Sequence, residues 1–342
     1  MTRVFVTRRI PEAGVDVLRR EGVEVQVGQV DDERPVERST VLDGVRRCDV
    51  LLPLLTEAVD GEVLEANPRL RGVANYAVGY DNVDVEAATS LGIPVSNTPG
   101  VLTDTTADLT WALLLAVARR LVEADRYARE GRYRIWGPNL LLGADVSPGG
   151  SGRRKVLGIV GFGRIGRAVA KRAVGFEMDV LVHDPYQRER IDAFGPPVRW
   201  AELHELLEAS DFVTLHPLLT DETRHLIGEP ELRRMKEDAC LVNVSRGPVV
   251  DEGALVRALR GGWIGGAGLD VYEDEPEMAP GLAELPNAVL APHVGSASRD
   301  TRDRMAVIAA TNALHHLRGE RAPDTVNPEV YEGNEWRART SP

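Results

Sequence analysis

The chain has 342 residues, of which 43% are hydrophobic, and its 41 basic and 53 acidic residues give a formal net charge of −12. This length exceeds the usual size of a single hydrophobic core, so we expect two domains. The acidic balance argues against binding to nucleic acid, which depends on neutralising phosphates.

The cysteines and the apolar runs restrict the class of protein further. Cys48 and Cys240 lie far apart and have no metal-ligand spacing, so we expect buried thiols in a reducing cytoplasm and no metal site. The longest apolar run, 111–118, is far too short to cross a bilayer, and the N-terminal residues lack a signal-peptide pattern. We therefore expect a cytoplasmic protein with no membrane partner.

The first hundred residues alternate between strand and helix patterns. We expect helices in this part at 11–20, 59–66 and 83–90. The expected strands are 4–7, 23–27, 49–55, 70–74 and 93–96. Strands separated by single helices predict a parallel sheet that is covered on both faces.

The rest of the chain repeats this rhythm after one long helical pattern, from about 103 to 129. A flexible loop at 147–152 precedes strands near 156–160, 180–183, 212–216, 241–244, 267–271 and 289–290. A helix near 299–317 and an extended tail at 323–327 follow, and we expect the tail to return to the first domain. The predicted fold class is α/β, with two Rossmann/flavodoxin-like domains and two chain crossings between them.

A glycine motif stands between the strand and the helix that open the second block. Gly161 permits a tight turn, Gly163 lets the backbone approach a pyrophosphate, and Gly166 lets helix and strand pack closely. Asp184 ends the next strand pattern, where a carboxylate can accept from the ribose hydroxyls. The motif indicates dinucleotide binding, and an ordinary strand–turn–helix connection is the alternative.

Three polar residues follow strands of the second block, namely Arg246, Glu275 and His293. Hydride transfer to a 2-keto acid needs a cation on the carboxylate, which a guanidinium binds bidentately, and a proton donor, for which histidine is suited. A carboxylate on the other ring nitrogen orients that histidine. Each residue alone has a commoner structural explanation, but their occurrence together at strand ends favours a catalytic site.

A loop in the first domain, Asn75–Gly79, also follows a strand. Its backbone N–H groups around Val78 and Gly79 can grip a substrate carboxylate as a small anion nest. A plain left-handed turn at Gly79 is the alternative reading of the same residues.

The motifs around these residues resemble those of the D-isomer-specific 2-hydroxyacid dehydrogenase family, and within it most closely the glyoxylate and hydroxypyruvate reductases. The resemblance extends over nearly the whole chain. It is carried by the segments 74–84, 97–108, 158–166, 242–251, 268–276 and 292–298.

This resemblance implies a catalytic trio of Arg246, Glu275 and His293, with His293 as the acid/base. The implied substrate contacts are Leu54, Asn75, Val78, Gly79 and Arg246. The implied cofactor contacts are Gly161, Phe162, Gly163, Arg164, Ile165, Gly166, Asp184, Pro217, Val244, Ser245, Asp270, Gly295 and Thr106.

The resemblance also implies the domain boundaries and the assembly. Residues 103–293 would form an NAD-binding Rossmann domain inserted into a substrate domain of residues 1–102 and 294–330, followed by a tail of 331–342. The helix after Thr103 would build the interface of a homodimer, with a plain core helix as the alternative.

The sequence departs from the family pattern at three places. Pro217 directly follows His216, one place earlier than usual, and has no N–H to offer a cofactor there. The loop between Gly143 and Gly158 is longer than usual. The aliphatic pair Leu140-Leu141 stands where close relatives carry a bulky aromatic residue or Met, which leaves substrate size open.

The cofactor and the reaction can then be predicted. Asp184 would repel a 2′-phosphate, so we expect NAD(H) in preference to NADP(H), although Arg188 and Arg190 nearby argue the other way. We expect reduction of glyoxylate or hydroxypyruvate to the 2-hydroxy acid. The alternatives are a phosphoglycerate or D-lactate dehydrogenase, a formate or phosphite dehydrogenase, and an NAD-sensing corepressor that binds partner peptides.

Overall fold

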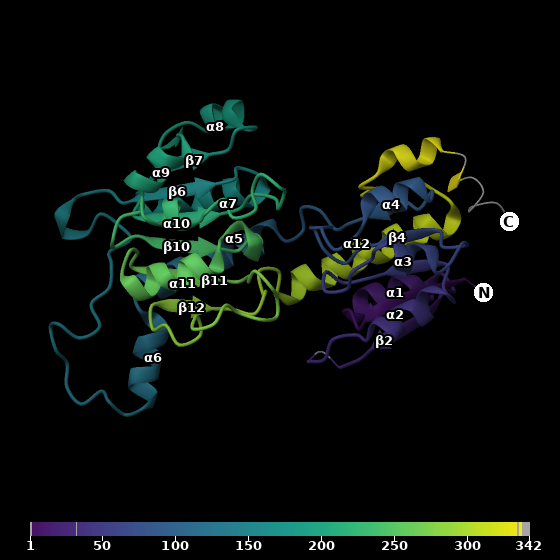
Figure 1. Ribbon diagram of the computed structural model, residues 1–342, viewed down its shortest axis with the longest axis horizontal. Coiled ribbons are helices and arrows are strands. Elements are labelled where there is room, and N and C mark those ends of the chain that lie inside the picture. The colour runs from purple at the N-terminus through teal and green to yellow at the C-terminus, as the bar shows by residue number, and fades with distance from the viewer. Residues whose placement is uncertain (1, 32, 334, 337–342) are drawn as a thin grey trace. The chain divides into compact units, whose positions relative to one another are not determined.

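The computed structural model describes residues 2–31, 33–333 and 335–336, and these form two compact units. The first unit combines the chain up to Leu102 with the part from Ser296 onward, and the second is the continuous segment Thr103–Gly295 (Figure 1). The predicted end of the inserted segment, His293, falls two residues short of this boundary. The segment extends to Gly295 because Val294 and Gly295 both donate their backbone N–H to the carboxylate of Asp270 in the second unit.

The first unit is built on a five-stranded parallel sheet with the order β2-β1-β3-β4-β5, which is the flavodoxin-like order. Its strands are β1 Arg3–Arg8, β2 Glu24–Gln29, β3 Val50–Leu52, β4 Gly72–Ala74 and β5 Val95–Ser96. Helices α1 (Glu12–Arg20) and α12 (Arg299–Arg318) pack on one face through residues such as Leu18 and Met305. The opposite face is covered by α2 Arg38–Val45, α3 Gly61–Glu65 and α4 Val85–Ser90.

The segment after α12 returns to the edge of this sheet, as predicted. Thr325 forms an antiparallel bridge with Ser96, and the N–H of Val326 donates to the carbonyl of Val95 at 2.7 Å. The predicted tail boundary at residue 331 falls inside a short 3-10 helix, η4 (Pro328–Glu332), so residues 331–336 continue the first unit where they are described. Residues 337–342 of the predicted tail lie outside the described part of the chain.

The second unit contains a seven-stranded parallel sheet with the order β12-β11-β10-β9-β6-β7-β8. Its strands are β6 Val156–Val160, β7 Asp179–His183, β8 Val198–Trp200, β9 Phe212–Leu215, β10 Cys240–Asn243, β11 Gly266–Leu269 and β12 Ala288–Leu290. This is the Rossmann order with one further strand, and its direction reverses between β6 and β9. Ligands of such sheets bind at this point of reversal, beyond the carboxyl ends of the strands.

Helices cover both faces of the second sheet (Figure 1). On one face, α5 (Thr103–Ala118) and α7 (Arg164–Ala173) bury residues such as Trp111 and Val169. The other face is covered by α9 Leu203–Ala209, α10 Glu229–Leu232 and α11 Glu252–Gly261. The remaining elements of this unit are α6 Leu121–Arg129, α8 Arg188–Phe194, η1 Gly149–Ser151, η2 Val174–Phe176 and η3 Gly247–Val249.

The long helix predicted from 103 to 129 is in fact two helices, α5 and α6. Arg120, between them, has a left-handed backbone with φ of 50°. The N–H of Ala144 donates at 2.7 Å to the carbonyl of Ala118, the last residue of α5, and a Cβ on Gly143 would lie 2.3 Å from that same carbonyl oxygen. The returning chain therefore takes the acceptor that a continuous helix would use, and α5 ends there.

Both cysteines are buried thiols, and burial raises the pKa of Cys48 and of Cys240 to about 12. Among the described residues, no helix combines the length and the apolar character that a membrane span requires.

Candidate active site

The glycine motif forms the turn between β6 and α7. Gly161 has φ of 90°, its N–H donates to the carbonyl of His183 at 2.9 Å, and a Cβ on it would lie 2.6 Å from the nitrogen of Pro217. A Cβ on Gly166 would lie 2.1 Å from the carbonyl oxygen of Gly161. Two of the three glycines are therefore required by the contacts of the turn itself.

The third glycine has a different environment. A Cβ on Gly163 would meet no heavy atom within 4 Å, so the backbone here is open. Gly163 is the N-cap of α7 and has no side chain to accept from the first turn, which leaves N–H groups available near Arg164 and Ile165. An open backbone at a helix N-terminus fits the pyrophosphate of a dinucleotide.

Asp184 has a second role that the sequence pattern does not reveal. Its Oδ2 accepts from the N–H of Phe162 at 2.7 Å, and its Oδ1 accepts from the N–H of Tyr186 at 2.9 Å. Each carboxylate oxygen keeps a further lone pair that can accept from a ribose hydroxyl. Asp184 therefore fixes the glycine turn and also carries the negative charge expected beside the ribose.

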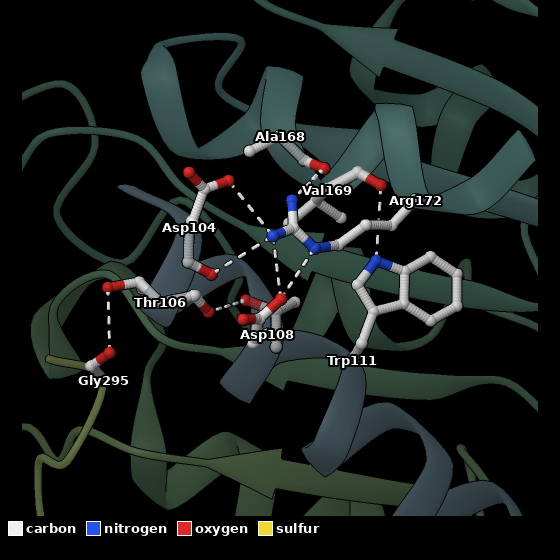
Figure 2. A network of polar contacts seen from close by, with 9 residues as sticks. Asp104, Thr106, Asp108, Trp111, Ala168, Val169, Arg172 and Gly295 are labelled. Carbon is white, nitrogen blue, oxygen red and sulfur yellow. Dashed lines mark hydrogen bonds and ion pairs between the residues drawn. The ribbon is translucent and has the colours of Figure 1, made fainter. Parts of the chain in front are cut away.

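Helix α5 presents Thr106 to the loop that follows β12 (Figure 2). The guanidinium of Arg172 on α7 bonds Asp108 at 2.8 Å and Asp104 at 3.1 Å, and this attaches the first turns of α5 to α7. Thr106 Oγ1 donates to the carbonyl of Gly295 at 3.2 Å. The sequence suggested Thr106 and Gly295 separately, and the structure brings them into contact.

Arg246 stands in a turn that Asn243 organises. Asn243 is buried at the end of β10, where its Oδ1 accepts from the N–H of Ser245 at 3.1 Å and from its hydroxyl at 2.8 Å. Its Nδ2 donates to the carbonyl of Arg246 at 2.9 Å. The half-buried guanidinium of Arg246 donates through Nη1 to the carbonyl of Ser245 at 2.8 Å. Sequence reasoning missed Asn243, whose only local signal is a polar residue ending a buried strand.

Glu275 and His293 form a direct pair in which His293 Nδ1 lies 2.8 Å from Glu275 Oε2. The other carboxylate oxygen of Glu275 accepts from the N–H of Tyr272 at 3.1 Å. His293 has a left-handed backbone with φ of 53°, and its N–H donates to the carbonyl of Asp270 at 2.8 Å. The side chains of the pair are 29% and 27% exposed, so the imidazole is held in place and still accessible.

Asp270 holds the segment that carries His293. Its Oδ1 accepts from Val294 N and its Oδ2 accepts from Gly295 N, both at 2.7 Å. Burial raises the pKa of Asp270, while the two amide hydrogen bonds and the nearby His293 act in the opposite direction. The carboxylate thus binds the two backbone N–H groups directly beyond His293.

The predicted trio comes from neighbouring strand ends. Strands β10, β11 and β12 pair side by side, and they precede Arg246, Glu275 and His293 respectively. The approach is closest at Gly247, where a Cβ would lie 1.7 Å from the carbonyl oxygen of Tyr272. Only glycine fits there, and this brings the chain beyond Arg246 against the chain that leads to Glu275.

The His216-Pro217 step that departs from the family pattern lies against the glycine turn. The ring nitrogens of His216 are buried and have no partner among the described residues, and this burial lowers the pKa of the imidazole to about 3. The backbone N–H of His216 donates to the carbonyl of Val160 at 2.7 Å. The nitrogen of Pro217 approaches Gly161 so closely that a Cβ on that glycine would lie 2.6 Å from it.

The proposed substrate loop of the first unit is held by two asparagines. Asn75 Nδ2 donates to the carbonyl of Gly79 at 2.9 Å, and Asn97 Nδ2 donates to the carbonyl of Val78 at 2.7 Å. Among the described residues, the N–H groups of Val78 and Gly79 have no partner. Leu54 lies in a neighbouring loop, where its carbonyl accepts from Asn82 at 3.0 Å.

No group of three or more His, Cys, Asp or Glu residues in the described part of the chain is arranged to hold a metal ion. The second unit thus presents the glycine turn between β6 and α7, the guanidinium of Arg246, and the carboxylate–imidazole pair of Glu275 and His293.

Comparison with known proteins agrees with this arrangement. Residues 111–295 match the family model described as D-isomer specific 2-hydroxyacid dehydrogenase, NAD binding domain. A glyoxylate reductase of Korarchaeum cryptofilum is 54% identical over 332 residues, which cover 96% of each chain.

Solved structures extend the comparison to the fold. A protein from Thermus thermophilus has a TM-score of 0.87 at 46% identity, over 95% of this chain and 100% of that chain. An NADPH-dependent glyoxylate/hydroxypyruvate reductase from Sinorhizobium meliloti, in complex with citrate, has a TM-score of 0.80 at 32% identity, over 95% and 98% of the two chains. This chain therefore belongs to the D-isomer-specific 2-hydroxyacid dehydrogenase family of oxidoreductases.

Proposed function

We propose that this protein reduces a small 2-keto acid, glyoxylate or hydroxypyruvate, to the corresponding 2-hydroxy acid with NADH as the hydride donor. The observation that carries the proposal is the 2.8 Å pair of His293 Nδ1 and Glu275 Oε2, which follow β12 and β11 beside the strand β10 that leads to Arg246. The names of the relatives, glyoxylate reductase and glyoxylate/hydroxypyruvate reductase, support the choice of substrate.

Arg246 would bind the substrate and polarise its carbonyl group. A guanidinium offers parallel N–H donors that match a carboxylate, and its permanent charge stabilises the oxyanion that develops as the carbonyl is reduced. The hydrogen bond from Arg246 Nη1 to the carbonyl of Ser245 already restricts the side chain, so less entropy is lost when the substrate binds.

His293 would supply the proton. Its Nδ1 is engaged by Glu275, so Nε2 is the atom that can donate to the forming alkoxide. The carboxylate fixes both the ring orientation and the position of the proton. A bound nicotinamide would supply the hydride. The cofactor that carries it would be held by other residues of the second unit.

The cofactor contacts divide into three groups by their position. The pyrophosphate would bind the turn from Gly161 to Gly166, including Phe162, Arg164 and Ile165. The ribose would bind Asp184. Residues at the ends of the other strands and of α5 would contact the rest of the molecule, namely Pro217, Val244, Ser245, Asp270, Gly295 and Thr106.

NAD(H) is the expected cofactor because Asp184 keeps a negative charge where NADP(H) would carry its 2′-phosphate. The reductase from Sinorhizobium meliloti is NADPH-dependent, so membership of the family does not decide the matter. Arg188, a nearby cation, lies over the Trp200 ring, 4.2 Å from its centroid, and a phosphate would have to compete with that contact.

In the first unit, we assign Asn75, Val78, Gly79 and Leu54 to substrate binding. The support is the pair of N–H groups at Val78 and Gly79 whose own carbonyl oxygens are held by asparagines. The first unit would thus act as the substrate domain and the second as the cofactor domain.

We propose a homodimer that covers the exposed apolar residues of α6 and the segment after it. Helix α6 buries none of its own residues, and it extends with the following segment away from the sheet of the second unit (Figure 1). Ile135 and Trp136 are 80% and 73% exposed, and Leu121, Tyr133 and Leu142 are also largely exposed. Such a group of large apolar side chains is typical of an interface. The buried thiols support a location in the reducing cytoplasm.

One screen tests the proposed reaction. NADH oxidation is followed with glyoxylate, hydroxypyruvate, pyruvate and phosphohydroxypyruvate, and again with NADPH. We expect the largest kcat/KM with glyoxylate or hydroxypyruvate and NADH. A higher kcat/KM with phosphohydroxypyruvate would show that the proposed substrate is wrong. A higher kcat/KM with NADPH would show that Asp184 does not exclude the 2′-phosphate. Light scattering of the same sample measures the oligomeric state, and a monomer would contradict the dimer.

A further inference from the structure

A second histidine shares a left-handed backbone and a carboxylate partner with His293, although it uses the other ring nitrogen. His225 has φ of 52° and His293 has φ of 53°, so both have a left-handed backbone that is uncommon for residues other than glycine. His225 Nε2 lies 2.5 Å from Glu273 Oε1, while His293 pairs with Glu275. The two carboxylates are two positions apart on the same segment. The proposed reaction does not use the pair of His225 and Glu273.

The backbone of His225 is bound to the segment that follows Arg246. Its N–H donates to the carbonyl of Pro248 at 2.7 Å. Two residues further on, the N–H of Ile227 donates to the carbonyl of Val249 at 3.1 Å, and the carbonyl of Ile227 accepts from Asp251 at 3.0 Å. His225 therefore begins a short strip of backbone paired with the chain directly beyond Arg246.

The side chain of His225 is bound to the segment that carries Glu275. Glu273 also accepts at Oε2 from the N–H of Glu252, at 3.2 Å, on the first turn of α11. The buried carboxylate of Glu252 accepts in return from the N–H of Glu273 and from the N–H of Ala279, both at 2.7 Å. The segment 273–279 is thus fixed at both ends, and Glu275 lies within it.

We propose that His225 is a positioning residue that sets the spacing between Arg246 and the Glu275–His293 pair. Its backbone N–H binds the Arg246 segment, and its imidazole binds the Glu275 segment through Glu273. The close approach of Gly247 and Tyr272 brings the same two segments together, and His225 links them at a second point. This inference rests on the proposed function, because the spacing matters only if the three residues act on one substrate.

The left-handed backbone allows a selective variant. Glycine adopts this conformation without strain, so His225→Gly keeps the favoured backbone and removes only the imidazole. Glu273→Gln removes the charge from the other partner at nearly the same size. A matched control is Glu320→Gln, since Glu320 pairs with His315 at 3.0 Å in the first unit, away from any residue of the proposed machinery.

Steady-state kinetics, NADH titration and thermal unfolding of each full-length variant test the inference. We expect His225→Gly and Glu273→Gln each to lower kcat/KM for the keto acid about tenfold, which is the scale of a small misplacement of catalytic groups. The dissociation constant of NADH and the Tm should stay near the wild-type values. The double variant should be no worse than either single variant, because both remove the same link. Glu320→Gln should behave as wild type.

The possible failures can be told apart. If wild type reduces its keto acid and His225→Gly keeps the wild-type kcat/KM, the positioning role is wrong while the proposed function stands. If the NADH dissociation constant and the Tm change in parallel with kcat/KM, the link is only structural and the inference fails. If wild type oxidises NADH with none of the keto acids, the proposed function fails and the role of His225 fails with it.

Discussion

The carboxylate of Asp184 accepts a hydrogen bond from the backbone N–H of Phe162 at 2.7 Å, so the residue expected to select the cofactor also holds the turn that we propose as the pyrophosphate site. Substitution at this position therefore changes two properties together. Engineering of cofactor preference in this chain must replace both the charge and the two backbone hydrogen bonds.

Asp184→Ala is expected to weaken NADH binding without producing a good NADPH enzyme. The change removes repulsion of the 2′-phosphate, but it also leaves the N–H groups of Phe162 and Tyr186 without their acceptor. Loss of such bonds costs about 1–3 kcal/mol of unfolding free energy. Denaturant unfolding and titration with both cofactors measure the two effects, with Asp184→Asn as the control that keeps one acceptor oxygen. A stable variant with reversed preference would contradict the double role.

His293→Asn is expected to lower kcat by about 10²-fold or more, the usual size of an acid/base contribution. Asparagine tolerates the left-handed backbone at this position, so the loss should come from the missing proton donor and not from strain. The NADH dissociation constant should be unchanged, as a fluorescence titration can check. If the variant kept the wild-type kcat, His293 would not be the proton donor.

Arg246→Lys is expected to raise KM for the keto acid and to lower kcat, each by about tenfold, although the positive charge is kept. The ammonium group of lysine cannot form the two parallel hydrogen bonds of a guanidinium. NADH binding should persist. If the variant instead lost NADH and kept its affinity for the keto acid, Arg246 would belong to the cofactor site.

His216 should make the protein less stable in acid. Burial lowers the pKa of its imidazole from 6.5 to about 3, so between these values the unfolded chain binds a proton that the folded chain excludes. The free energy of unfolding should therefore fall as pH decreases from 6.5 towards 3, with a slope of up to about 1.4 kcal/mol per pH unit from this residue. His316, whose pKa burial also lowers to about 3, adds a similar contribution.

In the variant His216→Phe, the free energy of unfolding should depend less steeply on pH between 6.5 and 3, because this imidazole no longer titrates on unfolding. Urea unfolding at a series of pH values measures the change, and His316, left in place, supplies the remaining dependence. An unchanged slope in the His216→Phe protein would show that this imidazole does not titrate between the folded and unfolded states in that range.

Strand ends were the most predictable part of the site. Buried parallel strands are continuous apolar runs, so the sequence shows where β10 and β12 stop and which polar residue comes next. Arg246, Glu275 and His293 were selected because they occur together beyond the ends of β10, β11 and β12, since each alone has a commoner structural explanation. The domain order could be predicted for the same reason, since strands and helices alternate along the whole chain.

The supporting contacts could not be predicted, because they join residues far apart in sequence. Nothing local distinguishes Asn243 from any other polar residue that ends a buried strand, and nothing connects His225 with Glu273 before the fold is known. Short elements such as α2 and β8 were missed, since they carry too few apolar positions to show a period. The break at Arg120 depends on Ala144, which returns from a distant part of the chain.

That break has a consequence for how this protein can vary. Residues 119–143 belong to the second unit, and the two ends of this segment meet where Ala144 N donates to Ala118 O at 2.7 Å. A segment whose two ends meet can be lengthened, shortened or exchanged at a small entropic cost, without shifting the elements that flank it. Substitutions in residues 119–143 can therefore accumulate while α5 and β6 keep their positions. The surface of this segment can change without displacing the residues of the proposed active site.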